Sequence, residues 1–318
     1  MRRVVGARAS LLWCGPSSHI GRWLSLWRQL RRLLGLPPTD QSAVLAGLMA
    51  ALKAESEAAL GTPIATVSVS APWVAAWEED FPVDSVVNDA LAASGLAPWT
   101  LEASWPIYMG EVNAVLAANG LQHCRQRWCG VPAESVIWPN ITYFISLTND
   151  SLYTSFQPTE CFFFSAWANR LTLIDTKYGL DNLGSATTPA LFWDALRVFL
   201  DTRAADFAKT LSYGYAVTIL TAGEAANHPD FLAVVREVAR DISQGHRDGK
   251  GELRKHRAEV VVSDDPTYAA ARGSAFWLRT RIDWSYCKGV DGEDGKDGEG
   301  DGETVSQDNS DRGGHTEL

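Results

Sequence analysis

Apolar positions along the chain recur with two periods, about 3.6 residues in some segments and 2 residues in others, so the pattern predicts both helices and strands. Helical spacing that ends at glycine or begins near proline predicts helices over 41–60, 85–94, 110–119, 188–210, 229–240 and 264–282. Runs of β-branched and aromatic residues predict strands over 64–70, 141–147, 151–157, 160–174, 216–223 and 258–263. Strands that alternate with helices predict an α/β layered fold.

Several elements carry finer expectations. The helix over 41–60 has Thr39 or Asp40 as its N-cap and ends at Gly61. The helix over 264–282 has Pro266 at its start and Asp264 or Asp265 as its cap. Small residues in this last helix predict close packing on a neighbour: Ala269, Ala270, Ala271, Gly273 and Ala275. The helix over 188–210 is expected to turn a set of apolar residues inward: Leu191, Phe192, Leu196, Phe199 and Leu200.

Charge divides the chain into three parts. Residues 1–39 hold seven arginines and no acid, for a charge of +7, and residues 288–318 carry −7. The body, 40–287, therefore carries the whole net charge of −10. An acidic body without a basic stripe argues against a nucleic-acid partner. No apolar run is long enough to predict a transmembrane segment. Five cysteines suggest a reducing compartment, so we expect a cytoplasmic protein.

The basic segment 1–39 allows three interpretations. We favour a helix over 20–35 that packs on the body. Arginine without acid is also typical of a mitochondrial transit peptide, which would give a mitochondrial location. Tryptophan and leucine at helical spacing between arginines are also typical of a helix that lies on a membrane surface. At the other end, the glycine-rich acidic segment 288–318 has too few apolar residues to offset the entropy of ordering, so it is predicted to be a disordered tail.

The familiar catalytic motifs are missing from the sequence. It contains no P-loop, no GxGxxG after a strand and no GxSxG elbow, and its six histidines show no zinc-like spacing with cysteine. Thus no catalytic residue and no metal ligand is predicted. One junction is of interest: in 218–235 a strand runs through a glycine turn into a helix that begins with proline, which lets a ligand approach backbone N–H groups.

Taken in order, several segments resemble one known family. The segments ILTAGEAANHPDF (219–231) and SDDPTYAAARGSAF (263–276) are similar to the adenosine-binding turn and the closing helix of the actin-like ATPase domain of heat-shock seventy-kilodalton chaperones. IATVSVSAPW (64–73) and GEVNAVLAANG (110–120) resemble a first-lobe strand and the connecting helix. The resemblance covers about residues 40–283 and is nearest to the divergent fungal branch.

This resemblance implies a two-lobe actin-like (ribonuclease H-like) α/β fold with an incomplete first lobe. Residues 40–135 would be the remnant of the first lobe and 136–287 the second lobe. It also implies ATP and Mg²⁺ as ligands. The residues that match the second phosphate hairpin and the adenosine turn are Thr148, Asn149, Asp150, Ser151, Gly223, Glu224 and Ala225.

The departures from the family concern the phosphates. The first hairpin, Asp-x-Gly-Thr, is absent, and SLTNDS (146–151) replaces the aspartate and glycines of the second. Ser146 or Thr148 stands in place of the acid, and Glu111 matches the connecting-helix glutamate. We therefore expect a pseudo-ATPase that acts as a scaffold for protein partners rather than an enzyme. A weak ATP-binding protein and an incomplete gene model of an active ATPase are the alternatives.

Overall fold

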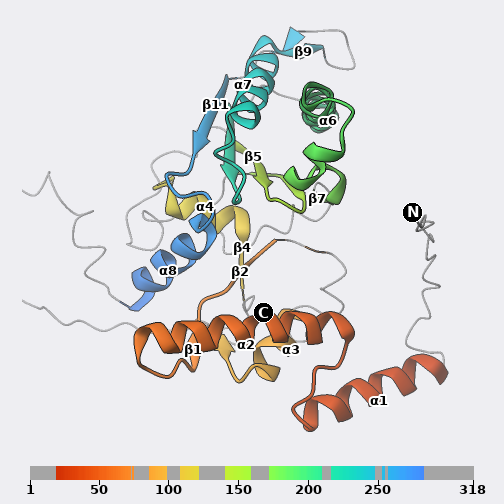
Figure 1. The fold of residues 1–318 in the computed structure, drawn as a ribbon, viewed down its shortest axis with the longest axis vertical. Helices are drawn as coiled ribbons and strands as arrows, with labels where there is room; N and C mark the ends of the chain where they lie inside the picture. The colour runs from red at the N-terminus through yellow and green to blue at the C-terminus, as the bar shows by residue number, and fades with distance from the viewer. Residues whose placement is uncertain are drawn as a thin grey trace, which may run out of the picture.

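The computed structural model describes residues 19–72, 74, 86–98, 108–121, 140–158, 172–209, 216–247, 253–254 and 257–282. The predicted tail, 288–318, lies outside these residues, as does most of the predicted strand over 160–174. The described part combines helices with a mixed sheet, which confirms the α/β class (Figure 1).

The main element is a five-stranded sheet in the order β11-β8-β5-β6-β7. It begins with an antiparallel meander of β5 (Asn140–Leu147), β6 (Leu152–Pro158) and β7 (Leu173–Asp175). β8 (Ala216–Ala222) then pairs in parallel with β5, and β11 (Arg257–Val262) pairs in parallel with β8. Four strands match the sequence prediction closely, because each is a continuous run of β-branched or aromatic residues.

Two helices cover one face of this sheet, α6 (Pro189–Ala208) and α7 (Pro229–Gln244). Odd-numbered residues of β5, such as Tyr143 and Ile145, face them, since side chains alternate along a strand. Buried residues of α6 include Phe192, Leu196 and Leu200, as predicted, and Phe199 is partly buried. The prediction for Leu191 was wrong, because its side chain is 55% exposed and Trp193 takes the inward place beside Phe192.

The opposite face carries α4 (Glu111–Ala118) and α8 (Ala269–Ile282). These two helices approach closely at Gly273, where an added Cβ would lie 1.6 Å from the carbonyl oxygen of Ala114. The small-residue prediction is thus confirmed. The cap prediction for Asp264 or Asp265 was wrong, because α8 begins at Ala269. Residues 266–268 form a turn before it, and the Pro266 oxygen accepts the N–H of Gly223 at 3.0 Å.

A smaller unit forms around α2 (Asp40–Leu60) and α3 (Val86–Ala93), which share an apolar cluster that includes Leu91 and Tyr108. Only short parallel pairs accompany them: β1 (Thr66–Val67) with β3 (Ala97–Pro98), and β2 (Ser70–Ala71) with β4 (Met109–Gly110). The continuous buried strand predicted over 64–70 is therefore two partly exposed pieces. The remaining short elements are η3 (Thr176–Tyr178), η4 (Leu180–Ser185), β9 (His246–Arg247) and β10 (Leu253–Arg254).

The start of α2 tests one capping prediction. The Thr39 hydroxyl accepts the N–H of Ser42 at 3.1 Å, and the Ser42 hydroxyl accepts the N–H of Thr39 at 3.0 Å. We expect Thr39→Ala to lower the free energy of unfolding by about 1 kcal/mol, since the replacement leaves a helix N–H without its acceptor. Urea unfolding would measure the change. Thr39→Ser, which keeps the hydroxyl, is the control, and an equal loss in both variants would contradict the capping role.

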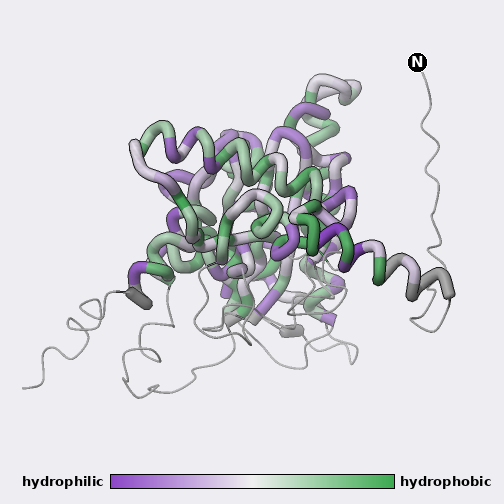
Figure 2. The backbone as a smooth tube through the Cα atoms, turned by 90° about the horizontal axis from the view of Figure 1, so that it is seen from below, coloured by the Kyte–Doolittle hydropathy of each residue, from purple (hydrophilic) through white to green (hydrophobic). Residues whose placement is uncertain are grey.

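The helix predicted over 20–35 is present as α1 (His19–Leu33), but it does not pack by its apolar side. The Arg32 guanidinium forms two hydrogen bonds to the Asp89 carboxylate of α3, at 2.7 and 3.0 Å. Five apolar side chains of α1 are exposed, and the helix projects from the rest of the chain (Figures 1 and 2). They are Trp23, Leu26, Trp27, Leu30 and Leu33. Among the described residues, no helix is long and apolar enough to cross a membrane.

Candidate functional site

The tip of the β5–β6 hairpin is closed by its own side chains. The N–H of Thr148 donates to the Ser151 oxygen at 2.9 Å, and the N–H of Ser151 donates back to the Thr148 hydroxyl oxygen at 2.9 Å. The Thr148 hydroxyl also donates to the Ser151 carbonyl at 3.0 Å. This arrangement follows from the residue types, since threonine and serine side chains bond readily to nearby backbone in turns. Two backbone donors of the tip are therefore used within it.

The turn after β8 lies against the end of β5. Gly223 has a φ of +96°, which favours glycine, and an added Cβ would lie 2.2 Å from the Leu147 oxygen. The N–H of Ala225 donates to the same oxygen at 3.1 Å. Gly223 therefore allows the ends of β5 and β8 to lie close together. A Gly223→Trp substitution would disturb the fold as well as the binding of any ligand.

A carboxylate links the two turns. The Oε1 atom of Glu224 accepts the backbone N–H of Asn149 at 2.9 Å, across 75 positions of sequence. The structure thus brings together the seven residues that the resemblance implied: Thr148, Asn149, Asp150, Ser151, Gly223, Glu224 and Ala225. The adjacency is as expected, but the role of Glu224 is not one that the sequence indicated. The Glu224 carboxylate occupies a hairpin N–H group that a phosphate-binding hairpin would leave open to its ligand.

A third segment, at the start of η4, packs against the hairpin tip. The N–H groups of Leu180 and Asp181 donate to the carbonyl oxygens of Thr148 and Asn149, at 3.0 and 2.9 Å. The chain can approach this closely because Gly179 has no side chain, and a Cβ there would lie 2.2 Å from the carbonyl carbon of Asp150. Gly179 is a site residue that the sequence analysis missed, since its partner lies 29 positions away in the chain.

Glu111 and Ser146 also meet, below the hairpin tip. Ser146 lies on the face of β5 that α4 covers, and Glu111 is the first residue of α4. Burial raises the pKa of Glu111 from 4.5 to about 7, and its hydrogen bond with the Ser146 side chain opposes part of that rise. Of the two positions proposed to replace the family's acid, Ser146 is the one that contacts Glu111. A serine there offers a hydroxyl in place of a carboxylate, so the pair lacks a second acid.

The charges around the tip are mostly negative. Asp150, Asp181 and Glu224 lie on the three segments that meet there, and Lys177, on η3, is close in sequence to Asp181. Such a surface repels a polyphosphate unless a cation intervenes. Among the described residues, no group of three or more histidine, cysteine, aspartate or glutamate side chains is arranged to hold a metal ion.

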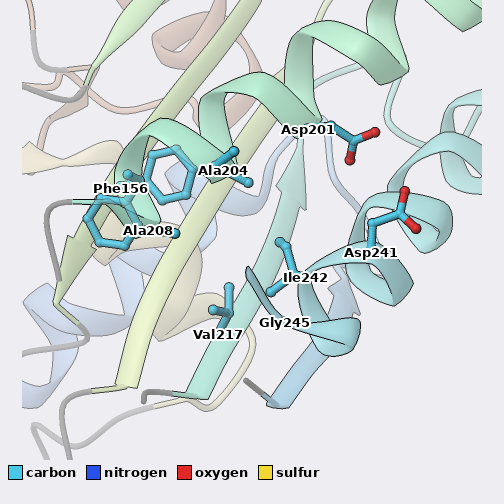
Figure 3. A pocket seen from close by; sticks show the side chains of 10 residues that line it. Phe156, Asp201, Ala204, Ala208, Val217, Asp241, Ile242 and Gly245 are labelled. Carbon is cyan, nitrogen blue, oxygen red and sulfur yellow. The ribbon is translucent and has the colours of Figure 1, made fainter. Parts of the chain in front are cut away.

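A cavity of about 280 Å³ lies elsewhere, at the opposite end of the sheet from the hairpin tip, between α6 and α7 (Figure 3). Its walls are mainly apolar and include Phe156 and Val217, and Asp201 and Asp241 stand on the two facing helices. Burial, then repulsion by Asp241, raises the pKa of Asp201. Arg197 reaches both carboxylates, at 3.1 and 3.8 Å, so the acids already have a cation. We interpret this cluster as a link between the helices.

Comparison of the sequence with protein families and curated proteins assigns no function to this site. No protein-family model matches the chain, and no curated protein matches it. The functional interpretation therefore rests on the contacts described above.

Proposed function

We propose that this chain is a degenerate actin-like protein that does not hydrolyse ATP and acts as a scaffold or interaction module for protein partners. The proposal takes 136–287 as an actin-like second lobe and 40–135 as the remnant of a first lobe. The meander of β5, β6 and β7, followed by parallel β8 and β11 with helices on both faces, supports this fold assignment.

The observation that carries the proposal is the hydrogen bond from Asn149 N–H to Glu224. Phosphate-binding hairpins work because their backbone N–H groups are turned toward the anion. Here the N–H groups of Thr148, Asn149 and Ser151 all donate to oxygens of the chain. A phosphate would have to displace a carboxylate from Asn149 and then remain close to it, so binding would cost both a charge-assisted bond and repulsion.

Catalysis has even less support. Phosphoryl transfer needs charges that organise Mg²⁺ and the attacking water. The Asp-x-Gly-Thr motif of the first hairpin occurs nowhere in the sequence, and Ser146 stands where the second hairpin would have its aspartate. Glu111, which matches the connecting-helix glutamate, is the acid that contacts Ser146. Burial raises the pKa of this carboxyl group to about 7. One carboxyl group beside a serine also offers fewer charged oxygen ligands than a pair of aspartates would.

Calorimetry tests the proposal directly. Titrating the full chain with Mg·ATP should give no saturable heat at millimolar nucleotide, because the N–H groups of Thr148, Asn149 and Ser151 already have acceptors. Glu224→Gln, which removes the charge and keeps an acceptor, and Glu224→Ala, which removes both, should still show no ATP hydrolysis. Micromolar binding by the unaltered chain, or turnover that a Glu111→Gln variant abolishes, would contradict the proposal.

A weak ATP-binding function is the second candidate. It is favoured by the geometry of the adenosine turn, in which Gly223 keeps a positive φ and Ala225 is bonded to the end of β5. In that case adenosine should bind as well as ATP does, since the binding energy would come from the turn and not from the hairpin. Competition between adenosine and ATP in the same calorimeter separates the two candidates.

A further inference from the structure

The exposed side of α1 is an apolar surface that no other described part of the chain covers. Five of its apolar residues are between 46% and 85% exposed: Trp23, Leu26, Trp27, Leu30 and Leu33. They recur at intervals of three and four residues, so they form one continuous face of the helix. Water-soluble proteins rarely leave such a face uncovered, and an exposed apolar patch of this kind marks an interaction surface.

The body holds α1 so that this face points outward. Arg32, on the opposite side of the helix, is paired with Asp89 of α3, and the Arg28 and Arg31 side chains are partly buried. The bidentate pair between Arg32 and Asp89 fixes the rotation of α1 about its axis. The helix also projects beyond the body in two perpendicular views, so the face is accessible to a broad, flat partner (Figures 1 and 2).

Charge selects the partner. Residues 1–39 carry +7 with no acidic residue, while the body carries −10. A second copy of the chain would bring two arms of the same sign together, which opposes dimerisation through α1. Nucleic acid would satisfy the arginines but would leave the leucines and tryptophans in water. An anionic lipid surface suits both the apolar face and the four arginines that precede it, Arg2, Arg3, Arg8 and Arg22, since it offers phosphate headgroups beside an acyl region.

We propose that α1 is an interfacial helix that docks this protein onto an anionic membrane surface, with the Trp23–Leu33 face in the headgroup and acyl boundary. The fifteen residues of α1 span roughly 22 Å, shorter than a hydrocarbon core of about 30 Å, so the helix lies in the plane of the surface. Tryptophan side chains suit this boundary, because an apolar ring and a polar N–H are both accommodated there. The inference is independent of whether the nucleotide site binds ATP.

Vesicle co-sedimentation with the full chain tests the proposal. The protein should sediment with vesicles of phosphatidylcholine and phosphatidylserine, and much less with phosphatidylcholine alone. Added salt should weaken the binding, since part of the attraction is screened. Replacing Arg2 and Arg3 by glutamine should weaken it by roughly fivefold for each arginine.

The apolar face is tested by a matched pair of double variants. Leu30→Ser with Leu33→Ser should reduce vesicle binding at least about tenfold, because two leucines leave the acyl boundary. Leu191→Ser with Val198→Ser changes two side chains of similar exposure on α6 and should leave the binding unchanged. Circular dichroism checks that both proteins remain folded.

Three results would overturn the proposal. The first is failure of the unaltered chain to sediment with phosphatidylserine vesicles at low salt. The second is binding that the α1 and α6 variants lose equally. The third is a change of molar mass in light scattering when α1 is altered, without any change in vesicle binding, which would show that α1 joins copies of this chain.

Discussion

Gly273→Ala is expected to destabilise the protein, although alanine favours helices. At an exposed helical position the change would add about 1 kcal/mol to the free energy of unfolding. At Gly273 the new methyl group would lie 1.6 Å from the Ala114 carbonyl oxygen, which belongs to backbone and cannot rotate away. The helices α4 and α8 would have to separate, and we expect a net loss of about 3 kcal/mol.

The sign of this effect is the test. Urea unfolding of Gly273→Ala would measure it, and Ala271→Gly, at an exposed position of the same helix, would measure the propensity term alone. If Gly273→Ala raises the free energy of unfolding by as much as Ala271→Gly lowers it, the two helices are not in close contact.

Glu111→Gln is expected to stabilise the protein at alkaline pH and to have little effect at acidic pH. The folded state holds the proton of Glu111 up to a pKa of about 7, whereas the unfolded chain releases it near 4.5. The favourable contribution of the protonated carboxyl group is therefore complete below 4.5 and is lost as the pH rises through 7. Above that range the native chain must bury a charge, at a cost of about 3 kcal/mol that glutamine avoids.

The pH profile checks this assignment. The difference in free energy of unfolding between Glu111→Gln and the unaltered chain should grow between about pH 4.5 and 7 and then level off. Glu55→Gln, at an exposed position of α2, removes the same charge without burial and is the control. A constant difference across the whole range would show that the Glu111 carboxyl group is in contact with water.

The local elements of this fold could be predicted because their signals are local. The cap at Thr39, the stop at Gly61 and the turn between β5 and β6 each depend on residues within a few positions of one another. The start of α8 could not be predicted in the same way. An Asp-Asp-Pro sequence favours a helix start, but the oxygen of Pro266 is held by Gly223 from another turn.

In the candidate site, too, contacts between neighbouring residues could be predicted and contacts between distant residues could not. The sequence analysis named residues of the hairpin and of the turn after β8, and in the structure these two turns lie side by side. The decisive contact, from Asn149 to Glu224, involves an exposed glutamate whose neighbours in the sequence give no sign of it. The orientation of α1 was hidden for a similar reason: its periodicity indicates an apolar face, but only the pair of Arg32 with Asp89 determines which way that face points.

The hairpin tip also has a consequence for how the chain folds. Its contacts come from segments near Leu147, Gly179 and Gly223. The N–H of Gly223 also donates a hydrogen bond to the Pro266 oxygen. The hydrogen bonds between Thr148 and Ser151 are local, but the contacts from the Gly179 segment need a long loop to close, and those from Gly223 also need β8 to pair with β5. Such closure is slow because its entropy is lost before the contacts form. We therefore expect the complete tip to form late in folding, and a partner that recognises all three segments would bind only chains whose sheet is complete.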